Sequence, residues 1–237
     1  MNIKEKIPWT QLAVEAVAIV VSILFAFWID ATWDRHQRQT GGHQLAIALM
    51  LDIEATQTHI DSLVDRSTRT KNLAKDILQG LADPSRRDHL PALLLNTGSV
   101  FIYHIWLPTT DTYDQAIGSG DLSLIDDLVL RSALAKHATE LASLGTFYDS
   151  AKLQYFDALE PFLVKNTVYS ELAASWNQDN LIGAPFSTDF QYLIESREFW
   201  NLLTLKLEIE ETILSRLESA NHSSDSLHSL LENYSDR

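Results

Sequence analysis

The apolar positions of this chain follow two patterns, one continuous and one periodic. From Leu12 to Ile29 the sequence reads LAVEAVAIVVSILFAFWI, in which only Glu15 and Ser22 are polar. An α-helix needs about 20 predominantly apolar residues to cross the ~30 Å hydrocarbon core of a bilayer. Together with its flanking residues the run is long enough, so it predicts an N-terminal transmembrane helix.

Tryptophans lie at both ends of this run, at Trp9, Trp28 and Trp33. Amphipathic indole rings favour the headgroup level of a membrane, which makes these three the predicted membrane-interface residues. The alternatives are a buried core helix and a cleaved signal peptide. Core helices rarely contain so few polar positions, and the bulky FWIDATWDR that follows lacks the small residues of a cleavage site. The pattern therefore favours an uncleaved anchor.

One face of the predicted membrane helix carries small and polar side chains. At about 100° per residue, the angles place Glu15, Ala18, Ser22 and Ala26 on one stripe. Small residues let helices approach closely in a bilayer, and an ionisable residue at membrane depth usually faces protein or water. The stripe predicts a helix-packing face for a second copy or for another membrane protein. The alternative is that Glu15 reaches the interface and the small residues coincide by chance.

Beyond residue 40 the apolar positions recur mostly at three- and four-residue steps, which is the helical period. The first helical stretch ends at Asp83–Pro84, and Gly41–Gly42 marks a candidate break before it. Val100–Leu107 reads VFIYHIWL and is the one candidate strand. It has no partner strand, so the alternatives are a buried extended connection or a short helix.

Further helices are predicted around Tyr113, from about Ser123 to Leu159 with a kink at Pro161, and from Asp189 to Leu231. In the last of these helices a heptad spacing predicts the positions that face the bundle. They are Trp200, Leu203, Leu207, Glu210, Leu214, Leu217, Asn221, Ser224, His228 and Leu231. The predicted fold class is all-α: an N-terminal transmembrane helix followed by an antiparallel helical bundle. Residues 1–40 form the tail, anchor and juxtamembrane segment, and residues 41–237 form the extramembrane domain.

The net charge of the chain argues against one class of binding partner. The chain carries a formal net charge of −14. Residues 1–40 sum to zero, so the acidic balance belongs to the extramembrane domain. Such a domain has no cationic surface to release counterions from phosphates, and nucleic acid is not an expected partner. The absence of cysteine excludes disulfides, thiolate zinc sites and iron–sulfur clusters.

Two tracts carry a resemblance to a known family. The first is EAVAIVVSILFAFWIDATW, which ends in Asp30 and Trp33; the second joins Tyr113 and Ser119–Gly120 to Leu124–Ile125 and a charged helix start. Both resemble an uncharacterised family of small bacterial single-pass membrane proteins of unknown function. The resemblance covers under a third of the chain. It implies a membrane-anchored helical architecture and no particular chemistry.

Motifs for catalysis, cofactors or metals are missing from the sequence. The eight histidines are scattered, and no metal-ligand pair, phosphate loop or nucleophile elbow is present. We therefore predict no catalytic, cofactor-binding or metal residues. The expected function is a membrane-anchored helical interaction or scaffold protein. The alternative is a membrane-tethered enzyme with an unrecognised site in residues 100–127 that uses His104, Asp111 and Tyr113.

Orientation rests on few charges. Lys4, Lys6 and the terminal amine precede the apolar run, and Arg35 and Arg38 follow it. Because the terminal amine adds one positive charge to the N-terminal side, the positive-inside rule predicts a cytoplasmic N-terminus. The expected location is the inner membrane of a bacterium, with the C-terminal domain in the periplasm. The expected partners are the lipid bilayer and, through the transmembrane helix, a second copy or another membrane protein.

Overall fold

The computed structural model describes residues 9–96, 98–175, 177 and 181–236, and their side chains from residue 14 onward. Every regular element in this part of the chain is a helix, so the predicted all-α fold is confirmed. The α-helices are α1 (Trp9–Ala82), α2 (Leu90–Asn96), α3 (Asp111–Ser119), α4 (Leu128–Gln154), α5 (Glu160–Asn166), α6 (Tyr169–Ala173), α7 (Phe190–Glu195) and α8 (Arg197–Ser235). Short 3-10 turns are η1 (Pro84–His89), η2 (Gly98–Phe101) and η3 (Asp121–Leu124), and η4 (Tyr155–Leu159) is a π-helical turn.

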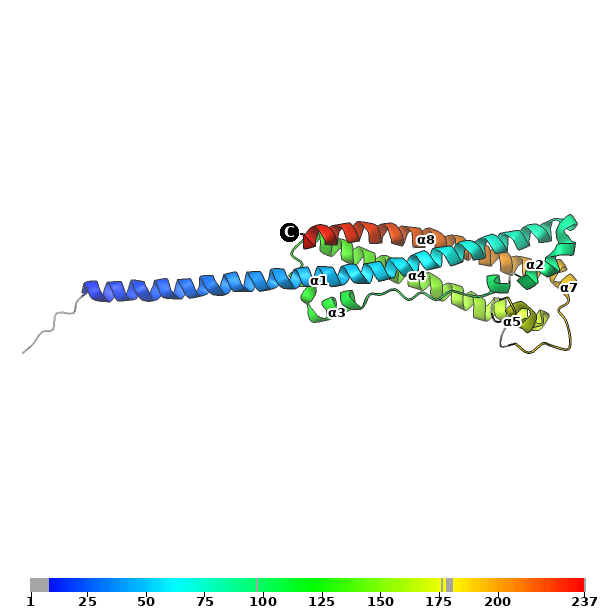
Figure 1. The fold of residues 1–237 in the computed structure, drawn as a ribbon, viewed down its shortest axis with the longest axis horizontal. Coiled ribbons are helices and arrows are strands. Elements are labelled where there is room, and N and C mark those ends of the chain that lie inside the picture. The colour runs from blue at the N-terminus through cyan, green and yellow to red at the C-terminus, as the bar shows by residue number, and fades with distance from the viewer. Residues whose placement is uncertain (1–8, 97, 176, 178–180, 237) are drawn as a thin grey trace, which may run out of the picture.

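Helix α1 runs for 74 residues without interruption (Figure 1). Its first half projects alone, and its second half is one of the long helices of a bundle. The break expected at Gly41–Gly42 is absent. A Cβ on Gly42 would lie 2.7 Å from the Leu124 carbonyl oxygen and 2.9 Å from the Tyr234 hydroxyl oxygen. Glycine is used at this point because η3 and the end of α8 approach the helix too closely for a side chain.

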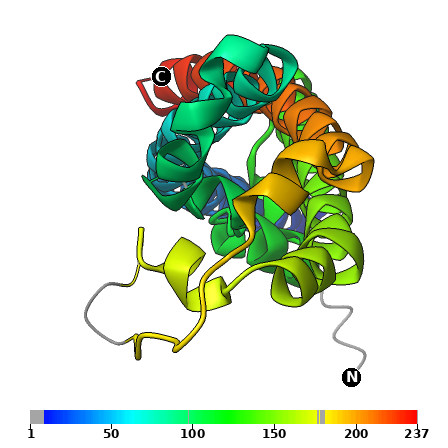
Figure 2. The same ribbon diagram turned by 90° about the vertical axis from the view of Figure 1, so that its right-hand side faces the viewer.

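Three long helices and one extended segment make the bundle. Helix α8 returns antiparallel to both α1 and α4, which themselves run in the same direction (Figures 1 and 2). Residues 102–110 have no regular secondary structure and run back along the bundle beside α1. The Thr56 hydroxyl of α1 donates to the Thr109 carbonyl oxygen at 3.1 Å, and the Trp106 ring stacks on Tyr148 of α4 at 5.8 Å. The segment therefore bridges α1 and α4 where a fourth helix would otherwise lie.

The three long helices bury side chains at alternating three- and four-residue steps, which is the heptad spacing of coiled coils. In α1 the buried positions at this spacing are Gly42, Ala46, Leu49, Ile53, Thr56, Ile60, Leu63, Ser67, Thr70, Ala74, Ile77 and Leu81, and Leu78 and Gly80 are buried beside them. In α4 they are Leu130, Leu134, His137, Leu141, Leu144, Tyr148 and Ala151, with Tyr155 continuing the series in η4. In α8 they are Phe199, Leu203, Lys206, Glu210, Ile213, Leu217, Ala220, Ser224, Leu227, Leu231 and Tyr234, and Leu202 and Leu214 are buried beside them.

The heptad period predicted for α8 is correct, and six of its ten positions are buried as predicted. These are Leu203, Glu210, Leu214, Leu217, Ser224 and Leu231. At Leu207, Asn221 and His228 the side chain turns partly towards solvent, and the residue before each of them is buried instead. Trp200 is 38% exposed, whereas its neighbour Phe199 is fully buried. Apolar type alone could not choose between adjacent residues of similar hydrophobicity.

The candidate strand at Val100–Leu107 is not a strand: Val100 and Phe101 lie in a buried 3-10 turn. The connection that follows has no regular secondary structure and, unlike the buried connection expected as an alternative, leaves Ile105 58% and Leu107 68% exposed. Helix α3 ends at Ser119 as expected, and Gly120 adopts the left-handed conformation at φ 82°. Helix α4 begins at Leu128, five residues after the predicted Ser123, because the Asp127 carboxylate caps it by accepting from the amides of Val129 and Leu130. The kink predicted at Pro161 appears as the π-helical turn that precedes it.

Replacing Gly42 tests the close approach at the base of the bundle. We expect Gly42→Ala to lower the free energy of unfolding by about 1–3 kcal/mol, because backbone or Tyr234 must move to admit the methyl group. Urea unfolding followed by circular dichroism measures this. Gly118→Ala is the control, since nothing lies within 4 Å of its Cβ position. Equal stability of the two variants would show that the helices do not meet at this distance.

Candidate functional site

The N-terminal part of α1 is an apolar surface that nothing in the chain covers. By length and composition this helix is the one candidate membrane span among the described residues, and none of its most apolar stretch is buried. Phe27 is 69% exposed and Leu24 is 63% exposed. Exposed apolar surface on this scale marks a site of contact with lipid or protein. The segment therefore requires a non-aqueous environment or a partner.

The stripe predicted for helix packing is fully exposed, at Glu15, Ala18, Ser22 and Ala26. The Ser22 hydroxyl donates to the Ala18 carbonyl oxygen at 2.8 Å, so it is satisfied within its own helix. Of the interface tryptophans, Trp28 and Trp33 are exposed at 63% and 68%, and the side chain of Trp9 lies outside the described residues. The stripe is therefore exposed on the surface of α1.

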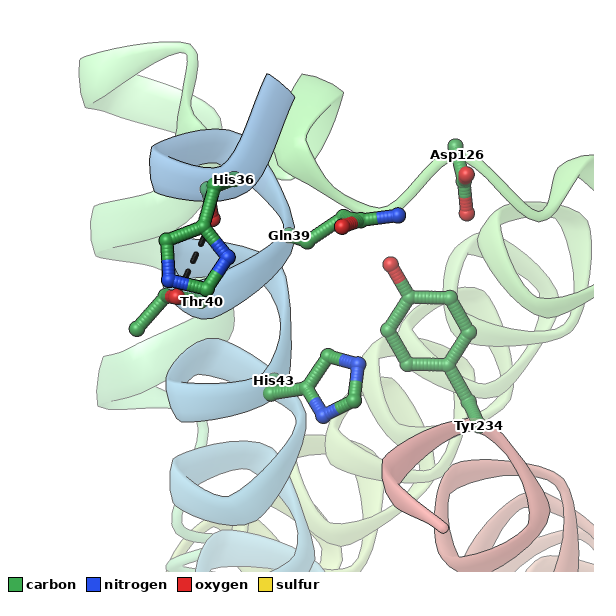
Figure 3. Close-up of a pocket in the computed structure, with 6 residues that line it drawn as sticks. All are labelled: His36, Gln39, Thr40, His43, Asp126 and Tyr234. Atoms are coloured by element: carbon green, nitrogen blue, oxygen red, sulfur yellow. Dashed lines mark hydrogen bonds between the residues drawn. The ribbon is translucent and has the colours of Figure 1, made fainter. Parts of the chain in front are cut away.

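A groove lies where α1 enters the bundle (Figure 3). It consists of two adjoining cavities of about 500 and 520 Å³ that share Gln39, Asp126 and Tyr234, and we call it the junction groove. One cavity is also lined by His36, Thr40 and His43, and the other by Ala31, Asp34, Arg35, Arg38, Ser123 and Leu124. Its walls come from α1, from the η3–α4 connection and from the end of α8.

Tyr234 anchors the wall of this groove. Its hydroxyl donates to the Leu124 carbonyl oxygen at 3.3 Å, and its ring lies 5.8 Å from the His43 ring. Burial raises the pKa of Tyr234, and the nearby Asp126 carboxylate raises it further by charge repulsion. The phenol therefore stays protonated and acts as a hydrogen-bond donor. The groove can offer both cationic and anionic side chains to a polar ligand.

The bundle core contains three apolar clusters along its length. Between neighbouring clusters, polar residues occupy the inward-facing positions of the long helices. The first polar layer joins Thr56, His137 and Ser223, and His137 Nδ1 lies 3.2 Å from the Ser223 hydroxyl oxygen. Burial lowers the pKa of His137, and the ring is 5% exposed. No hydrogen-bond partner reaches its Nε2 atom within the described part of the chain.

The second polar layer contains a buried ion pair. Lys206 Nζ lies 2.7 Å from Glu210 Oε1 and donates to the Ile102 carbonyl oxygen at 3.0 Å. Lys206 is 4% exposed and Glu210 is 1% exposed. Taking both charges out of water costs several kcal/mol for each ion, on the order of what their attraction returns. The extended segment stabilises the pair, because its irregular backbone leaves a carbonyl free to accept from the ammonium.

Other polar atoms gather around this pair. Burial raises the pKa of Tyr148, and the Glu210 carboxylate raises it further. Glu210 Oε2 is buried without a hydrogen-bond partner in the described chain, and the buried hydroxyls of Tyr148 and Ser67 lie beside each other. Burial also lowers the pKa of His104, although Glu210 opposes this shift, and the His104 ring lies 3.4 Å from the Thr70 hydroxyl. Unsatisfied groups of this kind cost stability and constrain the register of the helices.

The residues of the alternative enzyme site do not share one cavity. His104 lines a cavity of about 230 Å³ beside Trp106 and Tyr148. Tyr113 lines a different, mostly apolar cavity of about 30 Å³ beside Leu49 and Leu134. Asp111 is exposed in the first turn of α3. Within the described residues there is also no group of three or more histidine and carboxylate side chains that could hold a metal ion.

Sequence reasoning missed the buried ion pair and the junction groove. The signal for the pair was present, since Glu210 lay on the predicted heptad grid and Lys206 precedes it by four residues. The groove had no local signal, because its walls are 80 to 200 residues apart in the sequence. Comparisons with protein-family models, with curated proteins and with solved structures each found no match.

The ion pair predicts an asymmetric mutational response. We expect Glu210→Gln to lower the free energy of unfolding by about 3–5 kcal/mol, because it leaves the Lys206 ammonium buried without a counter-charge. The exposed neighbour provides the control Glu211→Gln, which should change stability little. The double variant Lys206→Met with Glu210→Leu should recover most of the loss, as measured by urea unfolding. A double variant no more stable than Glu210→Gln would refute this explanation.

The buried histidines predict a loss of stability in mild acid. Their folded-state pKa values lie below the ordinary value of 6.5, so the unfolded chain binds protons that the folded chain does not. The free energy of unfolding should fall as pH drops through about 6.5. The slope should be shallower in His104→Gln and His137→Gln and unaltered in the exposed control His222→Gln. Unfolding midpoints measured between about pH 7.5 and 5.5 check this.

Proposed function

We propose that this protein is a membrane-anchored helical interaction protein without catalytic activity of its own, which holds an acidic bundle beside a lipid bilayer. The observation that supports this most directly is the exposed apolar stretch of α1, which continues into the bundle as the same helix. Burying such a segment in lipid removes apolar surface from water at about 25 cal/mol per Å². The geometry of a single span suits one anchor for one soluble domain.

The proposed location is the inner membrane of a bacterium, with the bundle in the periplasm. The amine and lysines before the apolar run support a cytoplasmic N-terminus. The acidic charge of the bundle, which accounts for the net −14 of the chain, keeps it from lying flat on an anionic surface. A continuous α1 would then hold the bundle upright.

The shape of the domain suits a spacer that presents its far end. From Gly42 to Ala82, α1 extends about 60 Å at 1.5 Å per residue. The far end combines α2 and α5–α7 with η1, η2 and η4 and exposes apolar side chains, among them Val164 (60%), Phe186 (68%) and Tyr192 (49%). In this proposal a partner protein is contacted at a distance from the bilayer. The scattered positions of His104 and Tyr113 give no support to the enzymatic alternative.

The anchor is tested by extraction and by topology. We expect the full chain to stay with membranes during alkaline carbonate treatment, because a spanning helix is held by apolar burial and not by charge. A phosphatase reporter fused after Arg237, active only in the periplasm, should be active. A soluble chain would contradict the anchor, whereas an inactive phosphatase with an active cytoplasmic reporter would contradict only the orientation.

Larger side chains on the packing stripe test whether it is the contact face of the membrane helix. We expect Ala18→Leu with Ala26→Leu to reduce self-association of the membrane helix by about tenfold or more, since the bulk blocks close backbone approach. The matched control is Val17→Leu with Val20→Leu, which enlarges the opposite face. A two-hybrid assay for transmembrane association on the full chain measures this. Equal association of both double variants would show that the stripe is not the contact face.

A further inference from the structure

The junction groove combines charges of both signs at one place. Arg35 and Arg38 line it, and neither forms an ion pair with another residue that the structure describes. Asp34 and Asp126 line the same cavity, and both are exposed. Guanidinium groups bind phosphate through paired hydrogen bonds, and carboxylates accept hydrogen bonds from ammonium groups. A groove with both fits a ligand that carries a phosphate and an amine close together.

The groove also lies at a defined height on α1. If the hydrocarbon boundary falls at Ile29, then at 1.5 Å per residue Arg35 stands about 9 Å and Arg38 about 14 Å above it. The headgroup layer extends roughly 5–8 Å beyond the hydrocarbon on each side. Arginine side chains on a membrane helix reach back towards this interface. The guanidinium groups therefore come to the level of the lipid phosphates.

We propose that the junction groove binds the headgroup of phosphatidylethanolamine, with the phosphate at Arg35 and Arg38 and the ammonium at Asp34 and Asp126. The proposal rests on the anchoring of α1 in a bilayer. The same carboxylates select among lipids. A choline nitrogen has no N–H to donate to them, and an anionic phosphatidylglycerol brings no cation to offset their charge.

Hydrogen-bonding capacity in the groove supports an oriented ligand. The Gln39 side chain lines both cavities. In the first cavity the Tyr234 hydroxyl lies near Asp126 (Figure 3). Thr40 donates to the His36 carbonyl oxygen at 3.0 Å and is satisfied within α1. A headgroup seated here would touch α1, the η3–α4 connection and α8 at once. It would therefore join the stalk to the base of the bundle.

Lipid retention measures the proposal directly. The full chain is reconstituted into vesicles with equal amounts of phosphatidylcholine, phosphatidylethanolamine and phosphatidylglycerol, extracted in mild detergent, and weighed by native mass spectrometry. We expect one retained phosphatidylethanolamine, preferred about tenfold over each of the others. Added phosphoethanolamine should displace it only at far higher concentration, because the soluble zwitterion lacks the bilayer attachment. Displacement at equal concentration would assign the site to a free phosphate ester and overturn the lipid.

Two double variants, each of which removes one positive and one negative charge, separate recognition of the headgroup from general electrostatic attraction. Arg38→Ala with Asp126→Asn should abolish the preference, whereas Arg86→Ala with Asp88→Asn at the far end of the bundle should retain it. Circular dichroism and carbonate extraction check that every variant stays folded and membrane-bound. A chain that stays inserted but retains the three lipids equally overturns the headgroup site alone. A chain released by carbonate overturns the anchor and with it this inference.

Discussion

One unbroken helix, α1, carries both an exposed apolar stretch and one wall of the bundle. Its apolar first half is exposed, and its second half contributes a row of buried side chains at heptad spacing to the bundle. The point of transition is Gly42, where the Leu124 carbonyl and the Tyr234 hydroxyl approach too closely for a side chain. Because the helix is uninterrupted there, the position and direction of the bundle follow from those of the apolar first half of α1.

The extended segment sets the character of the core. A fourth helix would satisfy its own backbone, whereas residues 102–110 leave carbonyls and amides that the neighbouring helices must satisfy. Thr56 and Lys206 do this from α1 and α8, and Glu210 then balances the lysine. The buried polar residues between the apolar clusters thus follow from packing three helices around a segment without regular secondary structure. They constrain the register of the helices at a cost in stability.

Much of this fold follows from local patterns in the sequence. The apolar run, the end of α1 before Asp83 and the turn at Gly120 each have a short-range cause, and each was predictable. Gly41–Gly42 was misread as a break because its reason is a tertiary contact with Leu124, more than 80 residues away. Four of the ten heptad positions predicted for α8 are wrong, Trp200 among them, because Phe199 and Trp200 are both large and apolar and differ in burial. The junction groove needed three distant segments and had no local signal.

The continuity of α1 can be measured on the lipid-reconstituted chain. The sequence has no cysteine, so spin labels can be placed uniquely at the exposed residues Ala31 and Ala55. An unbroken helix spaces these positions by about 36 Å along its axis and predicts a single narrow distance distribution in double electron–electron resonance. A broad distribution, or one with a shorter mean, would show a hinge between anchor and bundle and would contradict the rigid connection.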